Sequence, residues 1–223
     1  PNEPAETKEM AGALRASGRD IIYSLSNNAP FQHAAALSSL AHSWRTTGDI
    51  TDDYATMARI GFDKNGKPEH AGPNGFNDPD MLEVGNGGMS LDEYTTHMTL
   101  WAMSAAPLLM GHDLRQTPPA MLRLLENREV IAVDQDAKAI QGKAVRKEGA
   151  VEIWSRPLAD GSVALALFNR GDAGAKIEAR PADAGFGTIT AARDLWRGQA
   201  VAADGLSFNV PSHGAVMLRV QGL

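Results

Sequence analysis

The sequence contains no cysteine among its 223 residues. A disulfide framework and any metal or catalytic site that uses thiolates are therefore excluded. The six histidines are scattered, and neither an HExxH pair nor an EF-hand loop is present, so the sequence predicts no metal and no cofactor. No apolar run reaches the roughly 20 residues that a membrane-spanning helix requires.

Positive charge is also scarce. Lys and Arg number 21 against 27 Asp and Glu, which gives a net charge of −6, and no basic run occurs. Nucleic acid and anionic membrane surfaces are therefore not expected as partners. The apolar fraction of 43% and the charged fraction of 22% are ordinary for a globular chain. The length allows one large domain or two modest ones.

The pattern of the chain changes near residues 137–143. Before this point, segments typical of helices alternate with short apolar runs typical of buried strands, which predicts a parallel sheet covered by helices. After it, short strands separated by turns predict a small antiparallel β-sandwich. We therefore predict an α/β domain over residues 1–137 and an all-β domain over residues 138–223.

Local signals mark individual elements of the first domain. Helices are expected over residues 4–17, 32–42 and 91–105, and strands covered on both faces over residues 21–25 and 107–110. Ser90 and Glu93 have the spacing of a capping box at the start of the third helix. Thr117 is expected to cap a further helix that Pro118 opens.

The second domain begins with a hairpin signal. Asp160-Gly161 separates the apolar runs Val151–Trp154 and Val163–Phe168. Further short strands are expected over residues 177–179, 188–196, 199–202, 206–210 and 215–220.

The stretch from Asn77 to Gly88 combines carboxylates, a proline and glycines around a short apolar step. Pro79 disfavours a helical conformation at Asp78, and the glycines permit backbone angles that other residues resist. Such a stretch is typical of a buried strand that turns into a loop. From these residues alone, a capped turn and an acidic sugar pocket both stay open.

Three segments, in this order and spacing, resemble family 27 glycoside hydrolases of the α-galactosidase and α-N-acetylgalactosaminidase type. They are Tyr23–Ser26, Trp44–Ile50 and the long segment from Asn77 through Trp101–Leu108 to Arg115. With Val133–Asp136 and the β-rich tail, the resemblance covers nearly the whole chain.

The resemblance implies a (β/α)8 barrel with a C-terminal antiparallel domain, and hydrolysis of terminal α-galactosyl residues with retention by two aspartates. Asp49 is similar to the general acid/base, and Arg45 to a residue that holds the sugar. Asp80 is similar to a pocket residue at the end of the seventh barrel strand. Ser26 and Ala29 correspond to the loop after the sixth strand, which reads the sugar's 2-substituent. Taken without the resemblance, Asp49 fits a helix cap and Arg45 a surface ion pair.

The resemblance also implies a nucleophilic aspartate after the fourth barrel strand, and no segment here corresponds to it. A complete barrel takes roughly 250 residues, whereas residues 1–137 correspond to about half of one, which we identify as about strands 6–8. A half-barrel exposes a sheet edge and an apolar face. We therefore expect the C-terminal part of a larger enzyme, inactive alone, whose partner is an N-terminal barrel half or a second chain. The family suggests a secreted or periplasmic protein, although no signal segment is visible.

The substrate expected from the resemblance is an α-galactoside, because that activity is the commonest in the family. Ser26 and Ala29 are small and leave room for an acetamido group, as in the N-acetylgalactosaminidases, whereas Asn27-Asn28 departs from both patterns. Two alternatives therefore stay open. They are an α-N-acetylgalactosaminidase and a sugar-binding or assembly fragment without catalysis.

Overall fold

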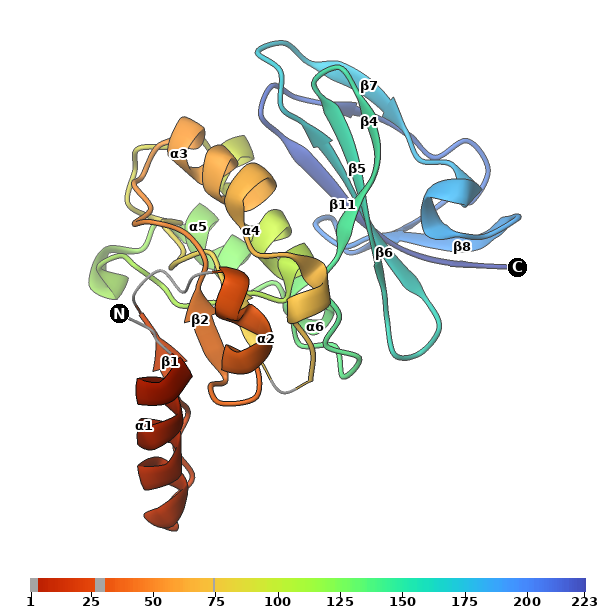
Figure 1. Ribbon diagram of the computed structural model, residues 1–223. Coiled ribbons are helices and arrows are strands. Elements are labelled where there is room, and N and C mark those ends of the chain that lie inside the picture. Colours follow the sequence, from red (N-terminus) through yellow and green to blue (C-terminus); the bar gives the residue numbers. More distant parts are fainter. Residues whose placement is uncertain (1–3, 27–30, 74) are drawn as a thin grey trace.

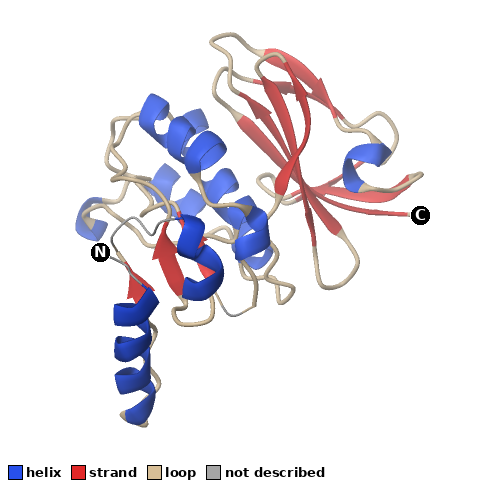
Figure 2. Cartoon of the chain, in the orientation of Figure 1, coloured by secondary structure: helices blue, strands red, loops and turns tan. Residues whose placement is uncertain are grey.

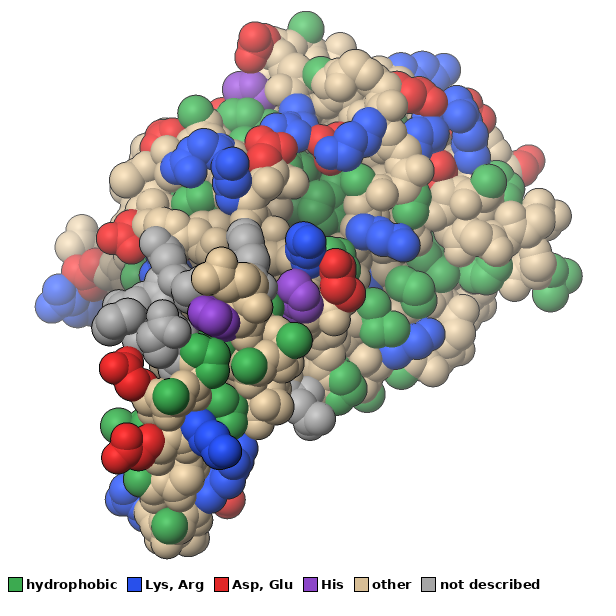
Figure 3. Space-filling model, in the orientation of Figure 1, with side chains coloured by type: hydrophobic (Ala, Val, Ile, Leu, Met, Phe, Trp, Pro, Cys, Tyr) green, Lys and Arg blue, Asp and Glu red, His purple; other side chains and the backbone are tan. Residues whose placement is uncertain are grey.

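The computed structural model describes residues 4–26, 31–73 and 75–223. A mixed part of helices and short parallel strands lies beside a part built of antiparallel strands (Figures 1 and 2). Helix α1 projects from the body of the first part (Figure 1), and only Thr7 and Ala11 of this helix are buried. Basic and acidic side chains are interspersed on the face that Figure 3 shows. No helix of the described residues is long and apolar enough to cross a bilayer.

Three strands form the parallel sheet of the first part, in the order β1-β2-β3. They are β1 (Ser24–Leu25), β2 (Ser43–Arg45) and β3 (Phe76–Asp78). A parallel bridge between Leu82 and Met110 follows them along the chain. The six helices are α1 (Pro4–Ala16), α2 (Ala34–Leu37), α3 (Tyr54–Ala58), α4 (Leu91–Ser104), α5 (Pro119–Leu125) and α6 (Arg128–Asp134), counted over the described residues. The predicted alternation of helices with a parallel sheet is confirmed.

Helix α4 begins at the capping box that the sequence predicts. The Ser90 hydroxyl accepts from the Glu93 N–H at 3.3 Å, and the Glu93 carboxylate accepts from the Ser90 N–H at 2.7 Å. This confirms the predicted capping box. From Thr96 to Ser104 every residue is buried, so the helix needs cover on all sides.

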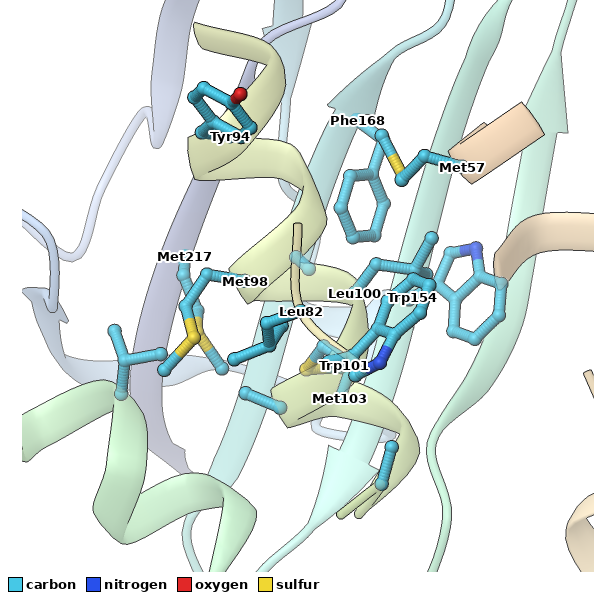
Figure 4. Close-up of a cluster of buried hydrophobic side chains, with 14 of the residues drawn as sticks. Met57, Leu82, Tyr94, Met98, Leu100, Trp101, Met103, Trp154, Phe168 and Met217 are labelled. Atoms are coloured by element: carbon cyan, nitrogen blue, oxygen red, sulfur yellow. The ribbon is translucent and has the colours of Figure 1, made fainter. Parts of the chain in front are cut away.

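The cover of α4 comes from both parts of the chain. Figure 4 shows Met98 and Trp101 of α4 in one cluster with Trp154, Phe168 and Met217 of the sandwich. Phe62, in the π-helical turn Arg59–Lys64 that continues α3, meets Trp154 and Phe168 edge-on. One core therefore joins the two parts.

The antiparallel part is a sandwich, as predicted. Its strands are β4 (Lys143–Glu148), β5 (Val151–Pro157), β6 (Val163–Asn169), β7 (Ala175–Glu178), β8 (Ile189–Asp194), β9 (Gln199–Val201), β10 (Ser207–Val210) and β11 (Ala215–Gly222). A six-stranded sheet, β4-β5-β6-β11-β8-β9, faces the pair β7–β10. Leu165 and Leu167 of β6 belong to the core inside the sandwich, whereas Ala166 and Phe168 belong to the core against α4. Burial on both faces explains why β6 shows no polar alternation. Strand β4 was not predicted.

Several elements of the first part are shorter than the sequence indicated. The helix predicted over residues 32–42 ends at Leu37, because the hydroxyls of the next two serines donate back to helical carbonyls. The strand predicted over residues 21–25 pairs only at Ser24–Leu25, and Ile22 is 81% exposed, so the prediction of cover on both faces was wrong there. Of residues 107–110 only Met110 pairs, in an isolated bridge with Leu82 instead of a strand.

Two further predictions need correction. The α5 cap is Pro118 instead of Thr117, whose hydroxyl donates to the Leu114 carbonyl at 3.1 Å. Strand β2 lies between β1 and β3, so two strand steps separate Ser26 from Asp80. Their assignment to consecutive sixth and seventh strands was therefore wrong.

Arg156 of β5 ties the two parts together. It is fully buried, and its Nη1 donates to the Ala102 carbonyl in the last turn of α4. Its Nη2 donates to the Asp134 carbonyl at the end of α6 at 3.0 Å. Carbonyls in the last turn of a helix lack helical partners and carry partial negative charge. One guanidinium therefore satisfies the ends of two helices.

We predict that Arg156→Leu destabilises the protein by about 3 kcal/mol, because the Asp134 carbonyl loses its donor and the Ala102 carbonyl keeps only the Ala105 N–H at 3.4 Å. Denaturant unfolding of wild type and variant measures this. Arg156→Lys can satisfy one carbonyl, so its unfolding midpoint is expected between those of wild type and Arg156→Leu. Arg115→Leu is the control, because that guanidinium is 87% exposed beside Asp113, and its midpoint should equal that of wild type. Equal midpoints for Arg156→Leu and wild type would contradict the assignment.

Candidate active site

The carboxyl ends of β1, β2 and β3 meet at one edge of the parallel sheet. Leu25 is aligned with Trp44, and Arg45 with Asp78. Catalytic groups of parallel α/β barrels lie at this edge, on the loops that follow the strands. The loops that begin here carry Ser26, Asp49 and Asp80.

Arg45 lies between two carboxylates at this edge. Its Nη2 is 2.7 Å from Asp80 Oδ2 and 3.3 Å from Asp49 Oδ1. The Arg45 and Asp80 side chains are nearly buried, whereas that of Asp49 is 97% exposed. Arg45 thus contacts a buried and an exposed acid through one nitrogen, and its buried Nε is unpaired among the described residues.

Asp80 is held in an unusual conformation. Its φ is 91°, a region that costs a non-glycine residue free energy unless the surroundings fix it. The Ile50 and Met81 N–H groups donate to its carboxylate at 2.9 and 2.8 Å, and Trp101 Nε1 donates to its carbonyl at 2.7 Å. Its own N–H donates to Asp78 at 2.8 Å. These bonds fix the carboxylate against Arg45.

Asp78 is a second buried carboxylate of the edge, and it was not selected from the sequence as a site residue. Burial raises its pKa, against the effects of the Asp80 N–H and the Arg45 charge. The signal was present as the second residue of the Asn-Asp-Pro-Asp motif. Its side chain serves the Asp80 backbone, so it supports the site without reaching solvent.

Three side chains of α4 hold the segment from Asp80 to Gly87 along its length. Trp101 binds the Asp80 carbonyl, as above. His97 Nε2 accepts from the Glu83 N–H at 3.0 Å, and the Tyr94 hydroxyl accepts from the Gly87 N–H at 2.6 Å. Residues 94, 97 and 101 are spaced by three and four, so they share one face of the helix. The sequence analysis predicted this helix but selected none of these three side chains as site residues.

The other predicted site residues are placed less fully. Ser26 follows β1 and is exposed. Ala29, and Asn27-Asn28 beside it, lie outside the described residues. No group of three His, Asp or Glu side chains that could hold a metal ion occurs within residues 4–26, 31–73 and 75–223.

An apolar groove of about 570 Å³ lies on the sheet face opposite the buried Trp44. Its walls include Ile22, Ser43 and Phe76 on one side and the segment 105–109 on the other. Ile22 and Leu109 are 81% and 63% exposed. The predicted open apolar face of the sheet is therefore present.

Comparison with known proteins gives consistent matches for both parts. Residues 3–136 match the family model "Alpha galactosidase A", and residues 148–220 match "Alpha galactosidase C-terminal beta sandwich domain". Alpha-galactosidase 2 of Arabidopsis thaliana is 47% identical over 190 residues, which cover 84% of this chain and 48% of that protein. The alpha-galactosidase of Cyamopsis tetragonoloba is 42% identical over 212 residues, which cover 93% and 52%.

A solved structure has the same arrangement. The α-galactosidase I of Mortierella vinacea matches with a TM-score of 0.89 at 28% identity, over 98% of this chain and 63% of that one. The first part is thus derived from a (β/α)8 barrel, and the second is the family's C-terminal β-sandwich. The chain spans about half the length of the curated relatives named above.

His97 should make the protein sensitive to acid. Burial lowers its pKa from 6.5 to about 3. Between these values the unfolded chain binds a proton that the folded chain does not, so this histidine's contribution to stability falls as pH falls from 6.5 toward 3. We predict that His97→Gln, which can still accept from the Glu83 N–H, loses this dependence. Urea midpoints of both proteins at pH 4 to 8 test it; parallel curves would contradict it.

Asp134 lines the apolar groove, and it should have the opposite effect on the pH dependence of stability. Burial raises its pKa from 3.8 to about 7. The folded chain retains this proton between those values while the unfolded chain releases it, so the contribution to stability falls as pH rises from 3.8 to 7. We predict that Asp134→Asn gains stability relative to wild type as pH rises through this window. A constant difference in urea midpoint between pH 4 and 7.5 would refute this.

Proposed function

The chain belongs to the α-galactosidase family, and we propose that it supplies the acid/base half of the active site of a retaining glycoside hydrolase. The proposed substrate is a terminal α-galactosyl residue. The observation that carries the proposal is Arg45 between the exposed carboxylate of Asp49 and the buried carboxylate of Asp80, at the carboxyl edge of the sheet.

The loop position and exposure of Asp49 support its proposed role as the general acid/base. It stands on the loop after β2, and its carboxylate is exposed toward solvent while Arg45 contacts it from the buried side. In a retaining mechanism one carboxylic acid protonates the leaving oxygen and then, as carboxylate, removes a proton from the attacking water. Asp49 performs both steps in this proposal.

Arg45 and Asp80 bind the sugar. An ionised carboxylate has about four lone-pair sites, and Asp80 uses three of them for Arg45, Ile50 and Met81. One acceptor site on Oδ1 therefore stays available for a sugar hydroxyl. Arg45 fixes this carboxylate from the buried side, through Nη2 at 2.7 Å from Oδ2. Because these groups are already fixed, binding costs little ordering free energy.

The nucleophile is assigned to the half of the enzyme that this chain does not cover. Retention needs a second carboxylate about 5 Å from the acid/base. We propose that residues 1–137 are a barrel half, with four parallel extended segments counted through the Leu82–Met110 bridge, and that residues 138–223 are the sandwich domain. The complementary half would cover the groove beside Ile22 and Leu109 and the open edge of β1.

The choice of sugar rests on the loop after β1. Ser26 is small and exposed there, and it leaves space near the 2-position. Such space fits an α-galactoside and also an acetamido sugar, so α-N-acetylgalactosaminidase is the second candidate. A non-catalytic sugar-binding or assembly role is the third.

We predict that the chain alone has little activity, and that it hydrolyses p-nitrophenyl α-galactoside when combined with the half of the Cyamopsis tetragonoloba enzyme that it does not match. Asp49→Asn should lower kcat/KM about 10³-fold on methyl α-galactoside and much less on the nitrophenyl substrate, because kcat/KM reports the first step, in which the nitrophenyl leaving group needs no proton. Asp204→Asn, an exposed carboxylate of the sandwich, is the control.

The outcomes separate the three candidates. Faster turnover of p-nitrophenyl N-acetyl-α-galactosaminide would favour the second candidate. Sugar binding by the combined halves with no turnover of either glycoside would favour the third. Robust turnover by the chain alone would contradict the assignment of half a site.

A further inference from the structure

Asp52 and Tyr94 join two loops at the edge of the proposed site. Tyr94 is 1% exposed, and its hydroxyl donates to Asp52 Oδ1 at 2.8 Å while accepting from the Gly87 N–H at 2.6 Å. The other oxygen of Asp52 accepts from the Gly88 N–H at 2.5 Å. One carboxylate and one phenol therefore bind two consecutive backbone amides of the segment that follows Asp80.

The two loops touch through their backbones as well. A Cβ on Gly88 would lie 2.1 Å from the Asp52 carbonyl oxygen, so no other residue fits without displacement. Gly87 has φ 99°, which favours glycine. The contact is therefore fixed by shape and by hydrogen bonds together.

Asp52 lies three residues after Asp49 on the loop between β2 and α3. Beyond Asp49, this loop is held by the Ile50 N–H on Asp80 and by Asp53, which caps α3 through the Thr56 N–H at 2.8 Å. The Asp49 side chain itself has only the 3.3 Å contact with Arg45 among the described residues. Its placement therefore depends on the loop that carries it.

We infer that Asp52 and Tyr94 are positioning residues, which hold the Asp49 loop against the segment Gly85–Met89 and so aim the acid at the leaving oxygen. This inference rests on the proposed function, because it assigns Asp49 the acid role. Burial and the bond to Asp52 raise the pKa of Tyr94, so its hydroxyl stays a donor over the range in which the enzyme would work. A displacement of the acid by about 1 Å can cost on the order of 10²-fold in rate.

Hydrogen exchange of the whole chain tests the loop contact without any substrate. Tyr94→Phe removes the shared hydroxyl and should speed exchange in peptides spanning residues 46–53 and 85–89 at least 10-fold, while β5 and β6 keep wild-type rates. Tyr54→Phe is the matched control, because the buried Tyr54 hydroxyl has no partner among the described residues. It should leave both peptides unchanged. Asp52→Asn retains one acceptor and should give an intermediate effect.

Kinetics of the combined halves test the role itself. Tyr94→Phe should lower kcat/KM about 10-fold on methyl α-galactoside and less than 3-fold on p-nitrophenyl α-galactoside, with KM for the methyl glycoside unchanged within 2-fold. A loss of folded protein would lower both rates equally. A change in the ratio of the rates on the two glycosides therefore reports how well the acid is placed. Asp52→Ala should lower the rate on methyl α-galactoside, relative to the nitrophenyl substrate, more than Asp52→Asn does.

The result that overturns the inference is an active wild type, dependent on Asp49, in which Tyr94→Phe changes neither the exchange rates nor the ratio of rates. A wild type that, combined with the complementary half, hydrolyses neither glycoside defeats the proposed function instead. In that case, hydrogen-exchange rates in Tyr94→Phe equal to those of wild type also contradict the inferred role of the loop contact.

Discussion

The structure depends on one helix that is buried along most of its length. From Thr96 to Ser104 no residue of α4 reaches solvent, so the sheet part must cover one side and the sandwich the other. The same helix presents Tyr94, His97 and Trp101 to the segment that carries Asp80. The packing that unites the two parts therefore also fixes the edge where the acids meet.

A few hydrogen bonds from that helix and its neighbours fix the backbone conformation of Asp80. Asp80 sits at φ 91°, and such a conformation persists only when several bonds determine it. Trp101 and Ile50 bind it from two different elements. Arg156 in turn satisfies the end of α4 from the sandwich. Rigidity at the candidate site is thus supplied partly by residues more than 50 positions away in the chain.

Sequence reasoning succeeded where the signal is local. The capping box of α4, the β5–β6 hairpin and the alternation of the first part follow from spacing within a few residues. It failed at the early end of α2, where the hydroxyls of two serines compete with the helical bonds, and at Ile22, whose exposure depends on which distant segments cover the sheet. For the site, family motifs selected Arg45, Asp49 and Asp80, which the fold brings to one edge. Asp52 and Tyr94 were missed because their contact spans 42 positions.

The polar atoms of the aromatic side chains of α4 illustrate the limit of prediction from sequence. Tyr94 and Trp101 follow a helical apolar pattern, and the pattern alone gives no reason to ask what their hydroxyl and ring N–H bind. Aromatic groups with a polar atom nearly always find a partner when buried. That rule predicts that partners exist, but only the fold identifies them.

The joint between α4 and the sandwich also constrains the order in which the protein can form. Thr96 donates to the His213 carbonyl across 117 positions, and Met217 of the last strand packs into the cluster around α4. The acid-bearing edge is synthesised before the sandwich, so the buried helix stays uncovered until β11 has been made. Contacts between distant segments form slowly, and a nascent chain that waits for them exposes apolar surface. Docking of the sandwich therefore completes the packing behind a candidate site whose residues Arg45, Asp49 and Asp80 all belong to the first part.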